Sequence, residues 1–163
     1  MIKSSKIKSI KELVKIRNTL RRQGKPVVFT NGCFDIIHRG HVECLRKAKS
    51  FGDVLIVGLN SDSSVRKIKG KKRPIVSQKD RAEILASLEM VDYVLIFKET
   101  TPFNVISKLV PDVLVKGGDY VKDNIVGSKI VESGGGRVKT VWQVKGRSTN
   151  NIIQKIVKRY GQL

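Results

Sequence analysis

Five short apolar runs, rich in β-branched residues, alternate along this chain with stretches of helical periodicity, and this alternation constrains the fold more than any other feature. The runs are Val27–Thr30, Val54–Leu59, Tyr93–Phe97, Asp112–Lys116 and Val138–Val144. Runs of this length and composition are typical of strands inside a sheet. We therefore expect five buried strands.

Helices are expected between these strands and at both ends of the chain. A capping box at Ser9–Glu12 begins the first helix, which ends near Gly24. The other helical segments are 41–50, a short turn at 63–67, 78–89, 103–109, and an amphipathic helix from 152 onward. Because strands that alternate with helices are joined by right-handed crossovers, the sequence predicts a doubly wound, Rossmann-like α/β fold. Its five-stranded parallel sheet should carry helices on both faces.

The length of the chain favours a single domain. With 163 residues, of which 40% are hydrophobic, it can bury one sizeable core but not two ordinary ones. We predict one domain over 1–163, with 1–25 as an N-terminal helical extension packed on it. Neither a signal peptide nor an 18-residue apolar run is present, and Cys33 and Cys44 are the only cysteines. We expect a cytoplasmic protein with reduced thiols and no membrane partner.

The charge balance points to anionic partners. Lys and Arg number 33 against 14 Asp and Glu, which gives a formal charge of +19. Such a surface attracts polyanions or anionic small molecules. A nucleic-acid-binding module is therefore one alternative, but it would need aromatic side chains for base stacking, and the basic run Lys67–Arg73 has none. We expect no nucleic-acid partner.

A loop with both histidines of the chain follows the first strand and opens a helix at the carboxyl edge of the sheet, where this architecture binds phosphates. His38 and His41 bracket Gly40, so their imidazoles can donate hydrogen bonds to charge that grows on a phosphate during displacement. We predict that these two histidines are catalytic. The residues predicted to bind the nucleotide phosphates here are Asn31, Gly32, Cys33, Phe34 and Gly40.

Two alternatives apply to the same loop. The histidines could be structural, although they are the only two in the chain and lie together at a strand-to-helix turn. Cys33, His38, His41 and Cys44 also form a C-x4-H-x2-H-x2-C run of plausible zinc ligands. Bringing all four together would unwind the start of the helix, so we predict buried, inert thiols and no metal ligands.

A second anion site is predicted near the end of the chain. Arg147, Ser148 and Thr149 precede the amphipathic helix, and a helix N-terminus with hydroxyls and a guanidinium suits phosphate. For Ser148 alone, a simple N-cap is the alternative. Because the histidine loop supplies a first anion site, we favour nucleotide binding by all three residues.

Three further segments should meet at the same edge of the sheet. Lys69 and Arg73 flank Gly70, as a mobile lid over a triphosphate would, although a solvated loop is an equally simple interpretation for any single lysine. Arg81, near the start of its helix, adds another positive group. Lys116, Gly117 and Asp119 end the fourth strand in a flexible turn with a carboxylate that suits ribose or sugar hydroxyls.

Together these motifs resemble those of the bacterial D-glycero-β-D-manno-heptose 1-phosphate adenylyltransferase family, over nearly the whole chain. The segments that carry the resemblance are Phe29–Asp35, His38-x-Gly40-His41, Asn60–Asp62, Arg73–Val76, Asp80–Arg81, Lys116–Tyr120 and Ser148–Thr149. The HxGH segment is similar to all cytidylyltransferase-like enzymes, whereas Thr30–Asp35 and Val115–Tyr120 are similar to the heptose branch. Asn150 and Asn151 depart from the second threonine and basic residue of many relatives.

The resemblance implies a role for each group. The side chains that would hold or neutralise the triphosphate are His38, His41, Lys69, Arg81, Ser148 and Thr149. Those that would lie nearer the acceptor or the ribose are Asp35, Arg73 and Asp119. Lys116 completes the predicted substrate-binding set, and Gly117 the predicted nucleotide-binding set.

The implied reaction joins ATP, with Mg²⁺, and heptose 1-phosphate to give ADP-heptose and pyrophosphate, a precursor for lipopolysaccharide inner core or other surface glycans. Many family members carry a sugar kinase domain ahead of this unit. Because the sequence contains no such domain, a stand-alone enzyme is expected here. The alternatives are cytidylyl transfer to glycerol 3-phosphate or phosphoethanolamine, and adenylyl transfer to FMN or phosphopantetheine. The oligomeric state is left open, with a homodimer as one alternative.

Overall fold

An all-parallel sheet of five strands forms the centre of the computed structural model, which describes residues 4–118, 124–142, 144 and 146–161. The strands are β1 (Val27–Gly32), β2 (Val54–Asn60), β3 (Tyr93–Phe97), β4 (Val113–Gly117) and β5 (Arg137–Val141). Their spatial order is β3-β2-β1-β4-β5, and all four pairings are parallel. The predicted doubly wound α/β fold is confirmed, and the strand order reverses between β1 and β4.

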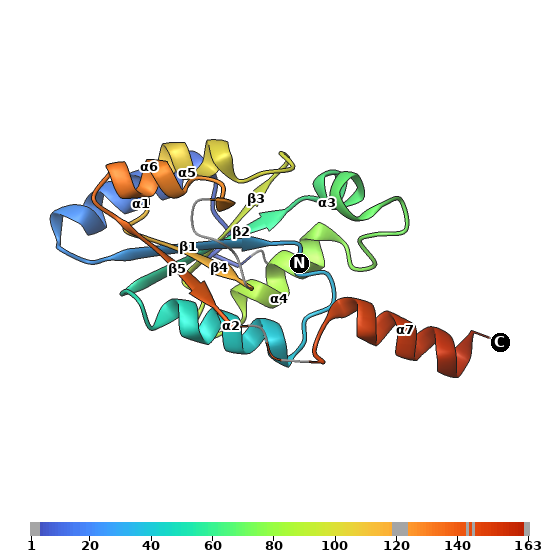
Figure 1. Ribbon diagram of the computed structural model, residues 1–163. Helices are drawn as coiled ribbons and strands as arrows, with labels where there is room; N and C mark the ends of the chain where they lie inside the picture. The colour runs from blue at the N-terminus through green and yellow to red at the C-terminus, as the bar shows by residue number, and fades with distance from the viewer. Residues whose placement is uncertain (1–3, 119–123, 143, 145, 162–163) are drawn as a thin grey trace.

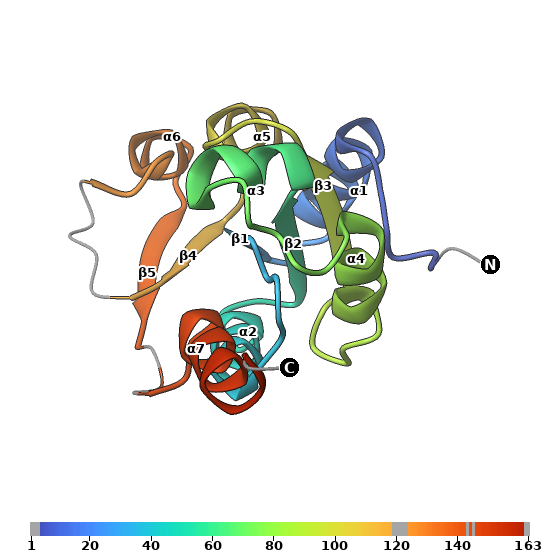
Figure 2. The same ribbon diagram turned by 90° about the vertical axis from the view of Figure 1, so that its right-hand side faces the viewer.

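Helices cover both faces of the sheet (Figures 1 and 2). One face carries α1 (Ile10–Arg22), α5 (Phe103–Leu109) and α6 (Ser128–Ser133), and the other carries α2 (Arg39–Lys49) and α4 (Gln78–Ala86). Beyond the carboxyl ends of the strands lie α3 (Asp62–Lys69) and α7 (Thr149–Tyr160). Among the described residues, no helix is both long and apolar enough to cross a bilayer.

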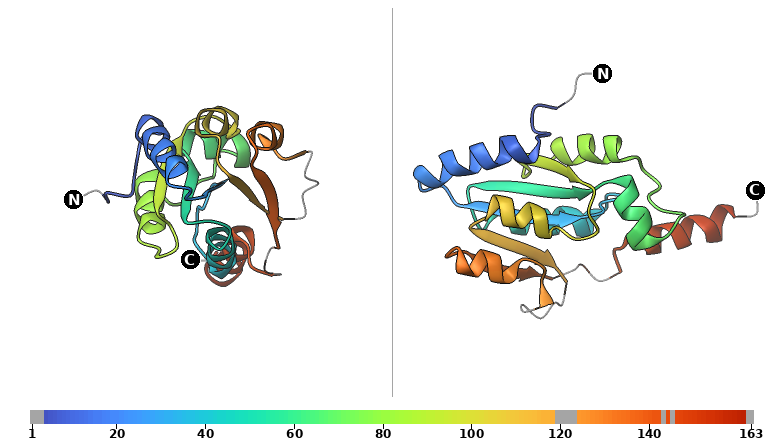
Figure 3. Two further views of the ribbon diagram at one scale, coloured as in Figure 1. Left: turned by 90° about the vertical axis from the view of Figure 1, so that its left-hand side faces the viewer. Right: turned by 90° about the horizontal axis from the view of Figure 1, so that it is seen from above.

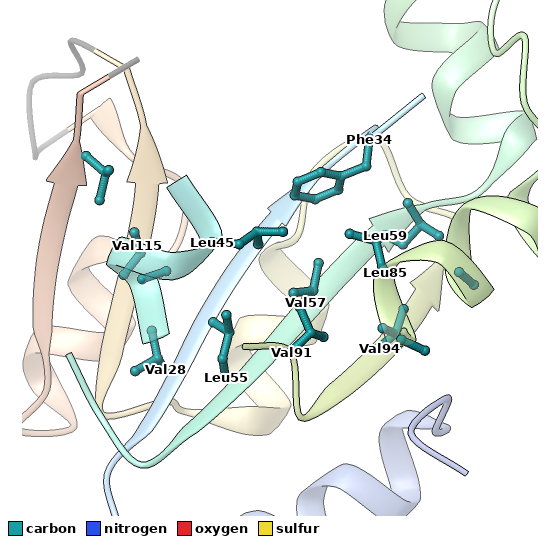
Figure 4. Packing of buried hydrophobic residues seen from close by; sticks show 14 of the residues in the cluster. Val28, Phe34, Leu45, Leu55, Val57, Leu59, Leu85, Val91, Val94 and Val115 are labelled. Atoms are coloured by element: carbon teal, nitrogen blue, oxygen red, sulfur yellow. The ribbon is translucent and has the colours of Figure 1, made fainter. Parts of the chain in front are cut away.

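Two hydrophobic cores flank the sheet because successive strand residues point to opposite faces. In β1, Val28 enters the core beneath α2 and α4, whereas Val27 and Phe29 enter the core beneath α1, α5 and α6. Figure 4 shows the first core, in which Leu45 of α2 and Leu85 of α4 meet the sheet residues. Strands buried on both faces account for the continuous apolar runs of the sequence.

The N-terminal segment lies against the edge of the sheet and then enters α1. Ile7 forms a parallel bridge with Val94 of β3, and the Lys8 amide donates to the Val94 carbonyl at 2.9 Å. The expected capping box is present: Ser9 Oγ accepts from the Glu12 amide, and the Glu12 carboxylate accepts from the Ser9 amide at 2.8 Å. This segment gives the edge strand β3 a partner.

Some element bounds differ from the sequence prediction. β5 ends at Val141 rather than Val144, and Trp142 is 84% exposed, so apolar character there does not mark a buried strand. α4 ends at Ala86 rather than at 89, because the chain must turn to bring Asp92 to β2. The Asp92 amide donates to the Leu55 carbonyl at 3.1 Å, and its carboxylate accepts from the Leu55 amide at 2.7 Å.

Candidate active site

A cavity of about 560 Å³ opens at the carboxyl edge of the sheet, around the ends of β1 and β4. Its wall includes residues from the loop after β1, the end of α3, the end of β4 and the N-terminus of α7. In Figure 3 (right), α3 and α7 approach this edge from different parts of the chain. The cavity therefore collects four of the segments that sequence analysis singled out.

The two histidines lie at the start of α2. His38 is the N-cap residue, and its ring stacks on that of His41 with centroids 3.9 Å apart and planes 24° from parallel. The ring of Phe34 lies 5.1 Å from that of His41. Both Nδ1 atoms are buried, and neither finds a hydrogen-bond partner within the described part of the chain. Because an unpaired buried polar atom is costly, the pair is suited to a polar ligand, such as one whose phosphate oxygens accept from an imidazole N–H.

Gly40 is required by the close packing of this turn. A Cβ atom at this position would lie 2.9 Å from His38 Cε1 and 3.3 Å from the backbone oxygen of Arg147. Any larger residue would therefore push the His38 ring from its place and separate the segment before α7 from α2. The glycine of the HxGH motif thus lets two helix N-termini approach each other.

Both imidazoles are biased toward the neutral form. Burial, reinforced by the neighbouring His38, lowers the pKa of His41 to about 4. Burial also lowers the pKa of His38. At neutral pH each ring therefore has one N–H to donate, and it can gain a proton only when negative charge approaches.

The N-terminus of α7 forms another part of the wall. Ser148 is the N-cap, and its Oγ accepts from the Asn151 amide at 3.1 Å. Thr149 Oγ1 donates to the Ile36 carbonyl at 3.5 Å, which joins α7 to the loop after β1. Ser148, Thr149 and Arg147 all line the cavity, so the predicted second anion site lies beside the histidine loop.

Asp35 lines the cavity and also holds the loop before α4. Its side chain is buried, and both carboxylate oxygens accept hydrogen bonds from the amides of Ile75 and Val76 at 2.8 to 3.0 Å. The Arg73 guanidinium also donates to it. Burial alone would raise the pKa of Asp35, but these amides and Arg73 outweigh that effect and hold the pKa below its ordinary value. The carboxylate thus fastens the loop before α4, and because Asp35 also lines the cavity, its contact with substrate stays a prediction.

Arg73 lines the cavity and links three segments. Besides Asp35, its Nη1 donates to Asn150 Oδ1 of α7 at 3.1 Å. The guanidinium is thus shared between the loop after β1 and the last helix. Asn150, whose role the sequence left open, is the α7 partner of this bridge.

The prediction for Arg81 needs correction. Its side chain is fully buried in α4 and lies outside the cavity wall. The guanidinium donates to the carbonyls of Val76, Cys33 and Asn60 and pairs with Asp62 at 2.8 Å. Because its hydrogen bonds go to these groups, it fixes the loop after β1 instead of facing the triphosphate. Arg81 is a positioning residue.

Lys69 and Lys116 both line the cavity. Lys69, the last residue of α3, is exposed, as a group that meets an incoming ligand would be. Lys116 at the end of β4 lies with its Nζ 3.5 Å from Asn31 Oδ1, and burial lowers its pKa. Two cationic side chains thus approach the cavity from opposite sides of β1.

The remaining predicted residues fall into two groups. Those that line the cavity as predicted are Asn31, Gly32, Cys33, Phe34, Gly40 and Gly117. Asp119 lies outside the described residues. Burial raises the pKa of both Cys33 and Cys44, so the thiol form is favoured at neutral pH.

The sequence analysis missed part of the wall. Thr100, Thr101 and Pro102 follow β3, and Asn124 to Val126 precede α6. Since the carboxyl ends of parallel strands share one edge, the position of the threonines after β3 could have revealed them. The segment before α6 carries no comparable signal, because it follows no strand directly.

The described wall offers little to a metal ion. Within the described residues, no cluster of three His, Cys, Asp or Glu side chains could hold one. Asp35 is the carboxylate of the described wall, and both of its oxygens are engaged. For a divalent ion at this part of the wall, the phosphate oxygens of a ligand are therefore the more suitable ligands.

Comparison with known proteins identifies relatives over most of the chain. A family described as cytidylyltransferase-like matches residues 29–155. Bifunctional protein HldE of Geobacter sulfurreducens is 57% identical over 158 residues, which are 97% of this chain and 32% of the relative. The HldE protein of Aliarcobacter butzleri is 54% identical over 153 residues, with 94% and 31% covered. The chain thus spans about a third of the length of these curated relatives.

Two solved structures share the fold. The lipopolysaccharide core biosynthesis protein of Thermoplasma volcanium has a TM-score of 0.60 and 28% identity, covering 76% of this chain and 100% of that one. Pantoate-beta-alanine ligase of Francisella tularensis, complexed with beta-gamma ATP and beta-alanine, has a TM-score of 0.64 and 17% identity, covering 98% and 79%. At this identity the second likeness shows the fold alone.

Proposed function

The chain belongs to the cytidylyltransferase-like family, and from that premise we propose that it transfers AMP from ATP to D-glycero-β-D-manno-heptose 1-phosphate. The observation that carries the transfer chemistry is the stacked pair His38 and His41, whose buried Nδ1 atoms lie where two helix N-termini meet. Such a site suits a chain of phosphates. The products would be ADP-heptose and pyrophosphate.

The reaction needs alignment more than it needs a base. An oxygen of the acceptor phosphate attacks the α-phosphorus of ATP, and the bond from that phosphorus to the bridging oxygen of pyrophosphate breaks. The second pKa of a phosphomonoester is about 6, so the attacking oxygen is already ionised at neutral pH. Catalysis then depends on in-line positioning and on donors that stabilise the leaving group.

The residues of the wall suit these tasks. His38 and His41 donate N–H groups to phosphate oxygens, and their low pKa values leave them neutral until negative charge develops. The N-terminal amides of α2 and α7 add donors and positive potential. Lys69 and Lys116 bring positive charge to the triphosphate and the acceptor phosphate. Mg²⁺ enters as part of the substrate, Mg–ATP.

The choice of acceptor rests on the relatives. HldE proteins more than 50% identical to this chain cover nearly all of it, and the motifs around Thr30–Asp35 and Val115–Tyr120 are similar to the heptose branch. The unassigned part of the wall, at Thr100, Thr101 and Asn124, offers hydroxyl and amide groups to a sugar. We place the reaction in the cytoplasm with small-molecule substrates, and a homodimer is one arrangement within the proposal.

Pyrophosphate release tests the proposal. ATP and CTP would be assayed with Mg²⁺ against heptose 1-phosphate, mannose 1-phosphate, glycerol 3-phosphate, phosphoethanolamine, FMN and phosphopantetheine. We expect the fastest turnover with ATP and β-heptose 1-phosphate. The enzyme should discriminate between ATP and CTP more strongly than between sugars. A wrong base leaves buried polar groups without hydrogen-bond partners, whereas a sugar that differs by one hydroxymethyl group does not. Faster turnover of CTP with glycerol 3-phosphate would refute the acceptor, and silence in every combination would refute the activity.

A further inference from the structure

The last helix has an apolar face that is largely uncovered. Ile152, Ile153, Ile156, Val157 and Tyr160 recur along α7 at the spacing of a single stripe. No residue of α7 is buried, and the exposed fractions are 49% for Ile156, 62% for Val157 and 59% for Tyr160. Figure 1 shows the reason: α7 leads away from the sheet, and its C-terminal half projects beyond the other elements. A short amphipathic helix in water gains most of its stability from a surface that covers its apolar face.

The polar face of α7 is entirely neutral or basic. It carries Lys155, Lys158 and Arg159 beside Asn150, Asn151 and Gln154. No acidic residue follows Glu132 in the sequence, whereas seven basic residues do: Arg137, Lys139, Lys145, Arg147, Lys155, Lys158 and Arg159. The proportion of basic to acidic residues is therefore higher after Glu132 than in the chain as a whole.

Elements beside α7 add to the positive charge. α2 lies on the same side of the sheet (Figure 2), and its Arg39 and Arg46 side chains are 72% and 61% exposed. Their acidic neighbour is Glu43, 3.5 Å and 3.3 Å away. The loop tied to α7 through Arg73 also carries exposed Lys71 and Lys72. Basic groups therefore lie on α7 itself and on elements near its N-terminus.

We propose that α7 binds an anionic lipid surface, lying in the plane of the headgroups with Ile156, Val157 and Tyr160 toward the acyl chains. A strongly amphipathic helix with Lys and Arg on its polar face suits this position. Each basic residue near an anionic membrane strengthens the partition about fivefold, so the charge of α7 adds to the burial of the stripe. The partner is complementary in both hydrophobicity and charge.

A second copy of the chain suits the stripe less well. Three partly exposed side chains offer a small apolar area beside the about 800 Å² that each partner buries in a standard interface. Two chains of +19 charge also repel each other. A lipid surface needs no such area, because electrostatic attraction to its headgroups supplements a small apolar contact.

Vesicle co-sedimentation of the full chain tests the proposal. The vesicles would be phosphatidylcholine alone or phosphatidylcholine mixed with phosphatidylglycerol. We expect binding to the mixed vesicles, weakened by salt, and little binding to phosphatidylcholine. Val157→Glu should lower the partition more than tenfold, since it removes apolar contact and adds negative charge. Gln154→Glu makes the same charge change on the polar face, so its loss should stay at about fivefold, the equivalent of about 1 kcal/mol.

Circular dichroism and light scattering accompany the assay. Neither position is buried, so both variants should keep the wild-type thermal transition. Equal binding to the two vesicle types, or equal losses in the two variants, would overturn the proposal. A dimer that Val157→Glu dissociates, without vesicle binding by the wild type, would assign the stripe to a second copy instead. These readouts are independent of nucleotidyl transfer.

Discussion

α2 and α7 turn their N-termini toward the same cavity, but they are anchored differently. α2 is fixed to the sheet by Leu45 and Ala48, which are fully buried, whereas α7 has no buried residue. The start of α7 is held by polar contacts, from Thr149 to the Ile36 carbonyl and from Arg73 to Asn150. One half of the candidate phosphate site is thus built into the core, and the other half is attached at its rim.

This difference separates two kinds of contribution. Groups on α2 are pre-organised, so they can stabilise a transition state at little cost in reorganisation. Groups on α7 are ordered partly by the ligand itself, so they should contribute more to binding than to the chemical step. Substitutions at His41, Ser148 and Asn150 separate these two contributions.

The largest expected effect is on stability in acid. The folded pKa of His41 is about 4 and lies below the ordinary 6.5, so the unfolded chain takes up its proton first as the pH falls. The part of the free energy of unfolding that depends on a neutral His41 is fully present above pH 6.5 and is lost as the pH falls from about 6.5 to 4. The wild type should lose up to about 3 kcal/mol more than His41→Asn over this window. Denaturant unfolding at several pH values measures this, and parallel curves would contradict a buried, neutral His41.

Removing His41 should abolish most of the chemistry. His41→Ala removes a hydrogen-bond donor from α2, the helix that is anchored in the core, and loss of such a donor lowers kcat by about 10²-fold. Ser148→Ala on α7 is the matched change in the other half, and we expect it to act mainly on the KM for ATP. Steady-state kinetics of both folded variants would decide. Similar kcat losses in the two would contradict the division between α2 and α7.

Lys69 should have a smaller effect. It is exposed at the end of α3, so Lys69→Ala should leave the free energy of unfolding unchanged. At subsaturating ATP, turnover should fall roughly tenfold if its ammonium meets the triphosphate. Lys67→Ala, at an exposed position of the same helix and outside the cavity wall, is the control. Equal turnover in the two variants would make Lys69 an ordinary surface charge.

The smallest effect should come from Asn150. Asn150→Ala removes the α7 partner of Arg73 and should raise the KM for ATP about threefold with little change in kcat, as expected for one exposed hydrogen bond of roughly 0.5–1 kcal/mol. Asn150→Gln keeps an uncharged amide acceptor for the guanidinium and should raise the KM less than Asn150→Ala does. A variant with a lower kcat and unchanged KM would place Asn150 in the fixed half.

The fold could be predicted from the sequence because its signals are local. Apolar runs, caps and turns each lie within a few residues, and parallel connection rules assemble them into one sheet. The histidine loop and the start of α7 could be placed in the same way, since both follow strands at the carboxyl edge. Sequence analysis therefore found both halves of the candidate site.

The partners of Asp35 and Arg81 could not be predicted, because they depend on contacts between distant segments. A buried carboxylate that accepts from the amides of Ile75 and Val76 looks the same in sequence as one that faces a ribose. Likewise Arg81 looks like a phosphate ligand until its burial beneath the Cys33 carbonyl is known. Charge in a motif identifies the region, whereas three-dimensional packing decides which charges are accessible.

The bridge between Ile7 and Val94 has a consequence for how the sheet avoids aggregation. An unpaired edge strand is a template for pairing with other chains. Residues 6–8 cover the edge of β3, so that it is not free to pair with another chain. At the opposite edge, β5 is short and carries Arg137 and Lys139. During synthesis residues 6–8 leave the ribosome well before their partner strand β3. Residues 6–8 can therefore cover the edge of the sheet only after β3 has been made. Until then, the positive charge of the nascent chain keeps it apart from neighbouring chains.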